Sequence, residues 1–393
     1  MDLTALRIAL FSGNYNMVKD GANQALNKLV GFLLANGAAV RVYSPTVPEP
    51  AFAPAGDLVS IPSVPVPGRG EYRAAFGLLP AARRDLTRFA PNLVHLSAPD
   101  PLGHSALNYG RRRGLPVVAS VHTRFETYPR YYGLAFLEPT VLALLRRFYR
   151  RCDAIVAPSE GFAQLLRDQR LNYDVGVWSR GLDRELWRPD RRDPGWRRSR
   201  GIGDDEVAIG FLGRVVMEKG LDVFADTTER LRERGVPHRV LVVGDGPARE
   251  WFARRMPDAV FTGFLQGGEL ARAVASMDVF FNPSVTETFG NVTVEAMAVG
   301  VPVVAARATG SESIVVDGIT GLLVRPGNIG GFADALAALT GDNARRHAMA
   351  EAGKREALRY DWNQVNGALA QTYLRVLRER QAGHAPFRRS PVP

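Results

Sequence analysis

The feature that most constrains the fold of this 393-residue chain is a regular alternation of short apolar runs with longer amphipathic stretches. The runs are rich in Val, Ile, Leu and Phe, as is typical of strands buried on both faces of a parallel sheet. The pattern occurs once in each half of the chain, and strands that alternate with helices favour right-handed crossovers. The sequence therefore predicts an α/β protein with two doubly wound, Rossmann-like parallel sheets that face each other across a cleft.

The expected strands of the first half are 8–11, 40–43, 93–96, 117–121 and 155–157, with helices such as 22–35 and 140–151 between them. The expected strands of the second half are 207–212, 240–243, 260–262, 279–282, 301–305 and 322–324, and the expected helices are 220–234, 247–255, 269–276, 291–299 and 331–339. A last helix, 362–380, has no strand after it.

The length predicts two domains, at about 100–200 residues per domain. We expect an N-terminal Rossmann-like domain at 1–180 and a C-terminal Rossmann-like domain at 181–360. We also expect a crossover helix at 361–381 that packs back on the N-terminal domain, and a flexible tail at 382–393. The stretch 178–200 is crowded with Arg, Asp, Pro and Gly and has little periodicity, which predicts a linker between the domains.

The net charge of +10 is uneven. Residues 1–180 hold 21 Lys and Arg against 13 Asp and Glu, whereas residues 181–393 hold 29 against 27. The first half therefore favours an anionic partner such as a phospholipid surface, an acidic acceptor or nucleic acid, with a solvated arginine-rich face as the alternative. No RNP, KH or helix-turn-helix pattern supports nucleic acid. The arginines that cluster in this half are Arg83, Arg84, Arg88, 111–113, Arg146, Arg147, Arg150 and Arg151.

The single cysteine, Cys152, excludes an intrachain disulfide and fits a reducing compartment. It ends an apolar helical pattern, so a buried structural thiol is favoured over a reactive one. The chain shows no signal-peptide pattern and no run approaching 18 apolar residues. We expect a cytoplasmic protein, with peripheral contact to the cytoplasmic face of a membrane left open.

The richest segment for chemistry is 287–298, which follows the expected strand 279–282 and a Pro-Ser turn. Gly290 and Asn291 suit the start of a helix, whose free N–H groups form an anion site. Glu287 lies before this helix and Glu295 more than a turn inside it. The two carboxylates could therefore accept hydrogen bonds from the sugar hydroxyls and the ribose hydroxyls of one sugar-donor molecule. Taken alone, the segment fits a surface helix with two solvated glutamates better.

A second segment favours the ligand-binding interpretation. Gly213 and Arg214 end a strand, and Lys219 stands at the opening of the next helix. These two cations would flank the same cleft and neutralise a diphosphate as the sugar leaves; the alternative is a basic loop without a ligand. No Asp-x-Asp sequence and no Cys/His cluster occurs, so we expect a site that needs no metal and no cofactor.

His122 follows an expected strand of the first half and could hydrogen-bond the donor sugar or shield the reacting centre, although a lone histidine is usually structural. The aromatic residues that follow it could pack on a sugar or lipid acceptor, or belong to the core. They are Phe125, Tyr128, Tyr131 and Tyr132.

Glycines at strand tips supply weaker signals. Gly21 lets the backbone approach a phosphate at the start of the helix after the first strand. The loop before it is no G-x-G-x-x-G fingerprint, so a nicotinamide cofactor is not supported. Gly244 and the Gly-Phe pair ending at Phe264 would expose backbone to a flat base.

Together these segments resemble family 4 of the retaining glycosyltransferases, which has the GT-B fold. The resemblance covers nearly the whole chain. It is carried by 211–214, 218–220, 243–247, Glu287 with Glu295, His122 and the sequence Trp-Ser-Arg-Gly-Leu-Asp at 178–183. The sequences around His122 and 178–183 look most like GDP-mannose-dependent α-mannosyltransferases and sulfoquinovosyl-diacylglycerol synthases.

The resemblance implies that domain 1–180 binds the acceptor and domain 181–360 binds the nucleotide sugar. It also implies a role for each matching residue. Glu287 would bind the hydroxyls of the transferred sugar and Glu295 the ribose, while Arg214 and Lys219 would bind the diphosphate. The backbone of Phe289, Gly290, Asn291 and Val292 would touch sugar and phosphate, His122 would sit beside the sugar, and Gly21 would lie near the phosphate. The implied reaction is front-face displacement with retention, in which the leaving diphosphate helps to deprotonate the acceptor.

The implied partners are a nucleoside-diphosphate sugar, with GDP-mannose preferred and a UDP-sugar (glucosyl or sulfoquinovosyl) as the alternative, and a lipid-linked acceptor. A nucleotide-sugar 2-epimerase is a rival with the same two-sheet architecture. It would need acid–base carboxylates and histidines converging on the sugar ring, which the set of two glutamates, one arginine and one lysine matches less well.

Overall fold

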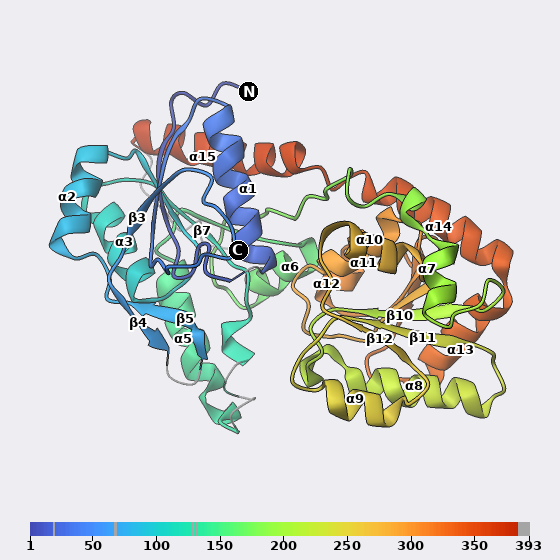
Figure 1. The fold of residues 1–393 in the computed structure, drawn as a ribbon. Helices are drawn as coiled ribbons and strands as arrows, with labels where there is room; N and C mark the ends of the chain where they lie inside the picture. The colour runs from blue at the N-terminus through green and yellow to red at the C-terminus, as the bar shows by residue number, and fades with distance from the viewer. Residues whose placement is uncertain (19, 67–68, 128, 130–132, 384–393) are drawn as a thin grey trace, which may run out of the picture. The chain divides into compact units, whose positions relative to one another are not determined.

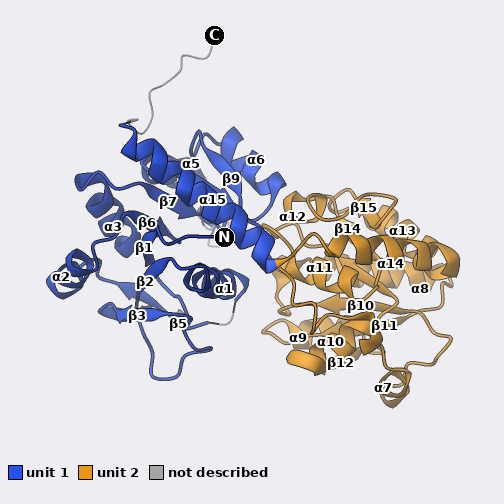
Figure 2. Cartoon of the chain, turned by 90° about the horizontal axis from the view of Figure 1, so that it is seen from above, with its two compact units in different colours: residues 1–180, 362–393 blue, residues 181–361 orange. Residues whose placement is uncertain are grey.

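The computed structural model describes residues 1–18, 20–66, 69–127, 129 and 133–383. The chain divides into two compact units (Figures 1 and 2): unit 1 is Met1–Arg180 with the segment from Trp362 onward, and unit 2 is Gly181–Asp361. The tail expected to be flexible lies, from residue 384, outside the described residues. Within the described part of the chain, no helix has both the length and the apolar character needed to cross a bilayer.

Unit 1 is built on a seven-stranded sheet in the order β3-β2-β1-β6-β7-β8-β9, with every pair of neighbours parallel. From β1 the chain moves outward to β2 and β3, and β6 then returns to the other side of β1 and leads to β7, β8 and β9. The switch point therefore lies between β1 and β6, where ligands of open α/β sheets bind. The strands are β1 (Arg7–Phe11), β2 (Ala39–Ser44), β3 (Asp57–Ser60), β6 (Leu93–Leu96), β7 (Val117–Ser120), β8 (Ala154–Ala157) and β9 (Val175–Val177).

Both faces of this sheet are buried, which explains the continuous apolar strands. In β1, Ile8 and Leu10 enter one core cluster, whereas Ala9 and Phe11 enter the other. The first cluster is closed by α1 (Gly21–Ala35) and α15 (Trp362–Gln381), which contact each other (Figure 1). The opposite cluster is closed by α2 (Pro80–Phe89), α3 (Pro101–Arg112), α5 (Glu138–Tyr149) and α6 (Glu160–Asp168), and it contains Cys152. The cysteine is fully buried, as expected for a structural thiol, and burial raises its pKa.

The last helix packs back on unit 1, as the sequence predicted. The hydroxyl of Tyr373 lies 2.7 Å from Nδ1 of His95 on β6, and both side chains are buried. Nearer the start of the helix, Trp178 donates from Nε1 to Oδ1 of the buried Asn366 at 3.1 Å. Buried polar groups need such partners, because an unpaired one costs about 1–3 kcal/mol. The helix is therefore fastened to the sheet by specific bonds as well as by apolar packing.

An antiparallel hairpin of β4 (Ser63–Val66) and β5 (Arg69–Ala75) was not predicted, and neither was β3. Proline and glycine interrupt residues 47–70, so these strands lack the apolar runs on which the prediction depended. The hairpin bonds to the long first loop, because the backbone N–H of Arg73 donates to Oδ1 of Asn14 at 3.2 Å. That loop is anchored further by Tyr15, which is fully buried and donates from its hydroxyl to Asn27 at 2.8 Å.

Unit 2 is built on a six-stranded sheet in the order β12-β11-β10-β13-β14-β15, again with parallel neighbours. Its switch point lies between β10 and β13. The strands are β10 (Ala208–Leu212), β11 (Arg239–Val243), β12 (Val260–Gly263), β13 (Val279–Asn282), β14 (Val303–Ala306) and β15 (Gly321–Val324). All six were predicted within two residues of their bounds.

Two cores again cover the two faces of the sheet. In β10, Ala208 and Leu212 join one cluster, and Ile209 and Phe211 join the other. The first cluster is covered by α10 (Gly267–Ala275) and α11 (Asn291–Ala298), and the second by α8 (Leu221–Glu233), α9 (Arg249–Arg255) and α13 (Ile329–Gly341). Short α12 (Thr309–Glu312) follows β14, and α14 (Asn343–Ala357) packs against α11 and α13. The sheets thus confirm the predicted doubly wound α/β architecture of each half.

The prediction of a linker at 178–200 is wrong for most of its length. The segment contains the helix α7 (Pro194–Ser199), and Trp187 and Trp196 are buried in a core of unit 2. Arg197 is only 1% exposed and donates to the Ser276 carbonyl at 2.7 Å and to the Asp278 carboxylate at 2.9 Å. These partners come from distant parts of the chain, so local composition could not reveal that the segment is part of the domain.

Candidate functional site

The loops that follow β10 and β13 meet at the switch point of unit 2. Lys219 ends the short 3-10 helix Met217–Lys219 after β10, and Glu287 lies in the loop after β13. Nζ of Lys219 is 2.5 Å from Oε1 of Glu287, with side chains 29% and 18% exposed. The structure therefore brings together two of the predicted site residues that are 68 positions apart in the sequence.

The loop that carries Glu287 is held by the segment after β14. Thr309 donates from its hydroxyl to the Glu287 carbonyl at 3.0 Å. A Cβ on Gly310 would lie 2.5 Å from the Phe289 carbonyl oxygen and 2.8 Å from that of Glu287, so only glycine fits there. On the other side, Thr286 donates to the Glu218 carbonyl at 3.2 Å. The backbone of the loop that carries Glu287 is thus held by neighbours on both sides.

Helix α11 begins where the sequence predicted. Gly290 is its N-cap with a φ of 106°, a conformation that favours glycine, and Asn291 and Val292 form the first turn. The first N–H groups of a helix have no intrahelical partner, so this end can accept an anion. Phe289 is 5% exposed and packs on Tyr360, so its side chain belongs to the core and only its backbone faces the loop.

Glu295 lies one turn further into α11. Its carboxylate forms no ion pair or hydrogen bond with any residue that the structure describes. Burial raises the pKa of this carboxyl to about 7. A ligand whose hydroxyl groups donate hydrogen bonds to this carboxylate would stabilise its charged form.

Glycines line the carboxyl edge of β10, β11 and β12. Gly244 has a φ of 136°, and its N–H donates to the Gly263 carbonyl at 3.0 Å. A Cβ on Gly244 would lie 1.9 Å from the carbonyl oxygen of Gly213, so no other residue fits without moving the backbone. Beside this edge, the Phe264 side chain is 67% exposed. The arrangement leaves backbone and one aromatic ring open to a planar group.

Arg214 directly follows this glycine edge. Its side chain is exposed, and its guanidinium forms no ion pair with any residue in the described part of the chain. The loop beneath it is fixed, because the N–H of Val215 donates to the Asp245 carbonyl at 2.9 Å. The structure therefore places Arg214 on an ordered loop beside Gly213 and leaves its charge available to a ligand.

The loops after β1 and β6 meet at the switch point of unit 1. A Cβ on Gly13 would lie 2.3 Å from Oδ2 of Asp100, which caps α3 after β6. Gly21 is the first residue of α1, and Asp20 before it accepts a hydrogen bond from the N–H of Asn23 at 2.7 Å. Burial raises the pKa of Asp20, against the opposing charge of Arg180. Gly21 thus stands at a helix N-terminus, as predicted, with a carboxyl group directly beside it.

His122 lies just beyond β7 on the same edge of that sheet. Its Nδ1 is 2.9 Å from Nη2 of Arg180, and its ring meets the ring of Trp178 edge-on with centroids 5.6 Å apart. The pKa of His122 is lowered well below its ordinary value, first by burial and then by the charge of Arg180. The imidazole is therefore neutral at physiological pH.

Three residues that shape these loops were not predicted as site residues: Arg180, Asp20 and Gly310. Arg180 lies inside the 178–183 segment, which is the one signal in the sequence that points to it. Phe125 is partly buried against a core cluster of unit 1, which fits the core alternative. Tyr128, Tyr131 and Tyr132 lie outside the described residues.

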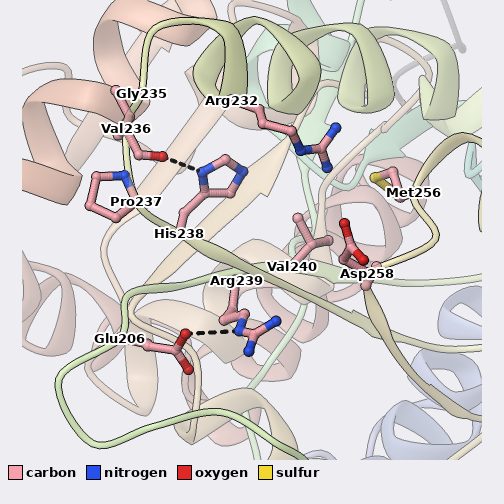
Figure 3. A pocket seen from close by; sticks show the side chains of 11 residues that line it. Glu206, Arg232, Gly235, Val236, Pro237, His238, Arg239, Val240, Met256 and Asp258 are labelled. Carbon is pink, nitrogen blue, oxygen red and sulfur yellow. Dashed lines mark hydrogen bonds and ion pairs between the residues drawn. The ribbon is translucent and has the colours of Figure 1, made fainter.

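Two further observations bear on what these loops can bind. Among the described residues, no group of three or more His, Cys, Asp or Glu is placed to hold a metal ion. A pocket of about 400 Å³ (Figure 3) lies at the amino-terminal ends of β11 and β12 and includes Arg232, His238 and Asp258. It contains none of the predicted site residues, which follow the carboxyl ends of the strands.

Comparison with known proteins gives two family matches that cover different parts of the chain. Residues 19–186 match the model described as Glycosyltransferase Family 4, and residues 206–342 match the model described as Glycosyl transferases group 1. A GDP-mannose-dependent alpha-mannosyltransferase of Mycolicibacterium smegmatis is 32% identical over 380 residues, which are 95% of this chain and 99% of that protein.

Sulfoquinovosyl transferase SQD2 of Arabidopsis thaliana is also 32% identical, over 309 residues. The match covers 76% of this chain and 60% of the length of the plant protein. Among solved structures, sucrose-phosphate synthase from Thermosynechococcus elongatus superposes with a TM-score of 0.77 at 19% identity, over 94% of this chain and 99% of that one. The chain therefore belongs to glycosyltransferase family 4, and it is a glycosyltransferase with the GT-B fold.

Proposed function

We propose that this enzyme transfers a hexosyl group, mannosyl from GDP-mannose in the first instance, to a lipid or glycolipid acceptor with retention of configuration. The observation that carries the proposal is the Lys219–Glu287 pair at the switch point of unit 2, beside the start of α11. The preference for GDP-mannose follows the mannosyltransferase that matches nearly the whole chain.

In this proposal unit 2 binds the nucleotide sugar. The base lies along the glycine edge at Gly213 and Gly244 beside Phe264, and the ribose hydroxyls donate to Glu295. The diphosphate accepts hydrogen bonds from the first turn of α11 and meets the charges of Arg214 and Lys219. Once Lys219 turns to the phosphate, the Glu287 carboxylate accepts hydrogen bonds from the hydroxyl groups of the sugar.

The proposed reaction needs no metal ion and no cofactor. The bond from the anomeric carbon to the diphosphate oxygen breaks while the acceptor hydroxyl oxygen bonds to the same face of that carbon. The acceptor proton passes to the leaving diphosphate, so charge and atoms balance without a protein base. Arg214, Lys219 and the helix N-terminus stabilise the charge that builds on the leaving group. We expect full activity after treatment with EDTA.

A lipid acceptor is supported by the names of relatives and by the surface around α5. An alpha-monoglucosyldiacylglycerol synthase of Streptococcus pneumoniae is 26% identical over 81% of this chain. Phe136 and Leu144 are 74% and 61% exposed, and Arg147 and Arg150 are exposed on the same helical segment. A pocket of about 450 Å³ between α3 and α5 is lined by Leu144, Leu145, Val141, Pro99, His104, Arg147 and Arg151. Apolar side chains among arginines suit an anionic lipid surface.

The second candidate donor is a UDP-sugar. A relative named for sulfoquinovosyl transfer favours it. A thermal-shift panel of GDP-mannose, UDP-glucose, UDP-sulfoquinovose and ADP-glucose separates the donors, since a true donor raises the melting temperature according to its concentration over Kd. Release of nucleoside diphosphate with and without diacylglycerol-based acceptors then tests transfer. No shift with any of the four donors contradicts the donor site in unit 2.

The proposed contact with an anionic membrane can be tested separately. Vesicles of phosphatidylglycerol and phosphatidylcholine should co-sediment the enzyme, and replacing Arg147 and Arg150 by Glu should abolish that binding. Replacing Arg232 and Arg234 by Glu, on unit 2, is the matched control and should leave it intact. Equal binding by all three proteins contradicts membrane contact through α5.

A further inference from the structure

The contact between Arg180 and His122 determines which nitrogen of the histidine carries its proton. Nη2 of Arg180 lies 2.9 Å from Nδ1 of His122. A guanidinium group has five N–H donors and no acceptor, so Nδ1 must accept this hydrogen bond. The ring is therefore neutral and its proton resides on Nε2.

Arg180 is well placed to keep this state. It is 6% exposed, its guanidinium lies over the ring of Trp178 at 5.4 Å, and it donates to the carbonyls of Trp178 and Ser179. Burial lowers the pKa of Arg180 to about 10, against the opposing charge of Asp20, so it stays charged below pH 9. Because Arg180 is charged and held in place, it remains the donor of this hydrogen bond and Nδ1 remains the acceptor.

Three further titratable groups lie near the ring in the described part of the chain, and each has a partner of its own. His95, on the neighbouring strand β6, has a pKa lowered to about 3 by burial and is held between Ser120 at 3.0 Å and Tyr373 at 2.7 Å. The charge of Asp20, at the start of α1, raises the pKa of Arg180. Arg124, two residues after His122, is paired with Glu126 at 2.9 Å. Of these described groups, Arg180 is the one whose charge is hydrogen-bonded to the imidazole.

We propose that Arg180 is a positioning residue that locks His122 in the Nε2–H tautomer, so that the histidine serves the sugar as a hydrogen-bond donor and not as a base. The matching atom of the substrate is an oxygen that accepts a hydrogen bond. A base is not needed in the proposed displacement, because the acceptor proton goes to the diphosphate. The locked tautomer itself stands on the geometry of unit 1, and only the contact with the sugar rests on the proposed function.

The tautomer can be measured without any substrate. In the full-length enzyme with ¹⁵N-labelled histidine, the His122 signals are assigned by their loss in His122→Asn. We expect a protonated Nε2 and an unprotonated Nδ1 that do not change between pH 5.5 and 8.5. In Arg180→Met the ring should populate both tautomers, since no fixed donor then holds Nδ1 as the acceptor. A wild-type signal from the Nδ1–H form or from a doubly protonated ring would overturn the inference.

Kinetics supply the second test. We expect Arg180→Met to lower kcat about 10- to 100-fold at pH 8, the effect of losing one aligned donor to the reacting group. The amide of Arg180→Gln can still donate to Nδ1 and should recover part of the rate at pH 8.

Arg167→Met is the matched control, since Arg167 bonds Glu160 and a carbonyl in the same unit without touching His122. It should leave the tautomer and the shape of the pH profile unchanged. If Arg180→Gln recovers no rate over Arg180→Met and the tautomer stays unchanged in both variants, Arg180 is only structural. If Arg180→Met does not fold, the wild-type spectrum and Arg180→Gln still decide. Failure of every donor in the thermal-shift panel would leave the tautomer measurement standing.

Discussion

The ammonium group of Lys219 lies 2.5 Å from Oε1 of Glu287, across the point where the strand order of unit 2 reverses. Each group neutralises the other while no donor is bound, and both are partly exposed. A donor that carries negative phosphates and neutral hydroxyls can separate the pair, because it offers each of them a new partner.

Replacing Lys219 by Ala should lower kcat/KM for the true donor about 100- to 1000-fold, the cost of losing one preorganised group at the leaving charge. Lys219→Arg should retain part of the rate. Lys354→Ala is the matched control, because Lys354 pairs with Glu351 at 2.6 Å with a similar exposure, on α14. Initial rates with saturating acceptor check this prediction. Equal losses in the two alanine variants would exclude a role for Lys219.

Affinity for the nucleotide should depend on the ionisation of Glu295. Its pKa is raised to about 7 by burial, and only the carboxylate can accept two ribose hydroxyls. We therefore expect affinity for the nucleoside diphosphate to rise as pH increases from 6 to 8, by up to about tenfold per pH unit below 7. Calorimetric titration of the wild type and Glu295→Gln checks this. The variant should bind weakly at both values, and Glu250→Gln, at an exposed position of α9, should behave like the wild type.

The Glu295 carboxyl should also make the free energy of unfolding depend on pH, in the direction opposite to its effect on nucleotide affinity. The folded state holds the Glu295 proton more tightly than the unfolded state, whose pKa is near 4.5. The free energy of unfolding without ligand should therefore fall as pH rises from about 4.5 to about 7, by about 1–3 kcal/mol from this group. Urea unfolding across this range measures the slope. A slope that is identical in Glu295→Gln would contradict the assignment to this residue.

Gly244→Ala should destabilise unit 2 by about 3 kcal/mol or more, because the new Cβ would meet the Gly213 carbonyl at 1.9 Å and the φ is positive. Gly268→Ala is the matched control. Nothing lies within 4 Å of its added Cβ, and alanine suits a helix, so it should stabilise slightly. Thermal unfolding measures both variants. A melting temperature for Gly244→Ala equal to that of the wild type would show that the glycine edge is less crowded than described.

Tyr373→Phe should cost about 1–3 kcal/mol, because His95 loses the partner of its buried Nδ1. Tyr173, which is 68% exposed, supplies the control Tyr173→Phe with an expected change within about 0.5 kcal/mol. Urea titration followed by tryptophan fluorescence measures the unfolding of both variants. If the two variants unfold at the same urea concentration, the Tyr373–His95 bond does not fasten α15.

The strands other than β3, β4, β5 and β9 were predictable because they are buried on both faces, and their apolar runs stand out in any local window. The helix start at Gly290 and Asn291 was predictable for a similar reason, since a glycine before an amphipathic run is a local signal. The hairpin at 63–75 and the fold of 178–200 were not predictable. Their stability comes from partners such as Ser276 and Asp278 for Arg197, which lie far away in the sequence.

Local sequence patterns were enough to predict the alternation of strands and helices, the strand ends at which polar residues gather, and the family to which those residues belong. The three-dimensional contacts add that Lys219 pairs with Glu287, that Phe289 turns into the core, and that Arg180 fixes the proton of His122. The two kinds of information differ in their range along the sequence. Local patterns fix backbone conformation, whereas contacts, burial and protonation depend on residues that the strand order brings together from distant positions.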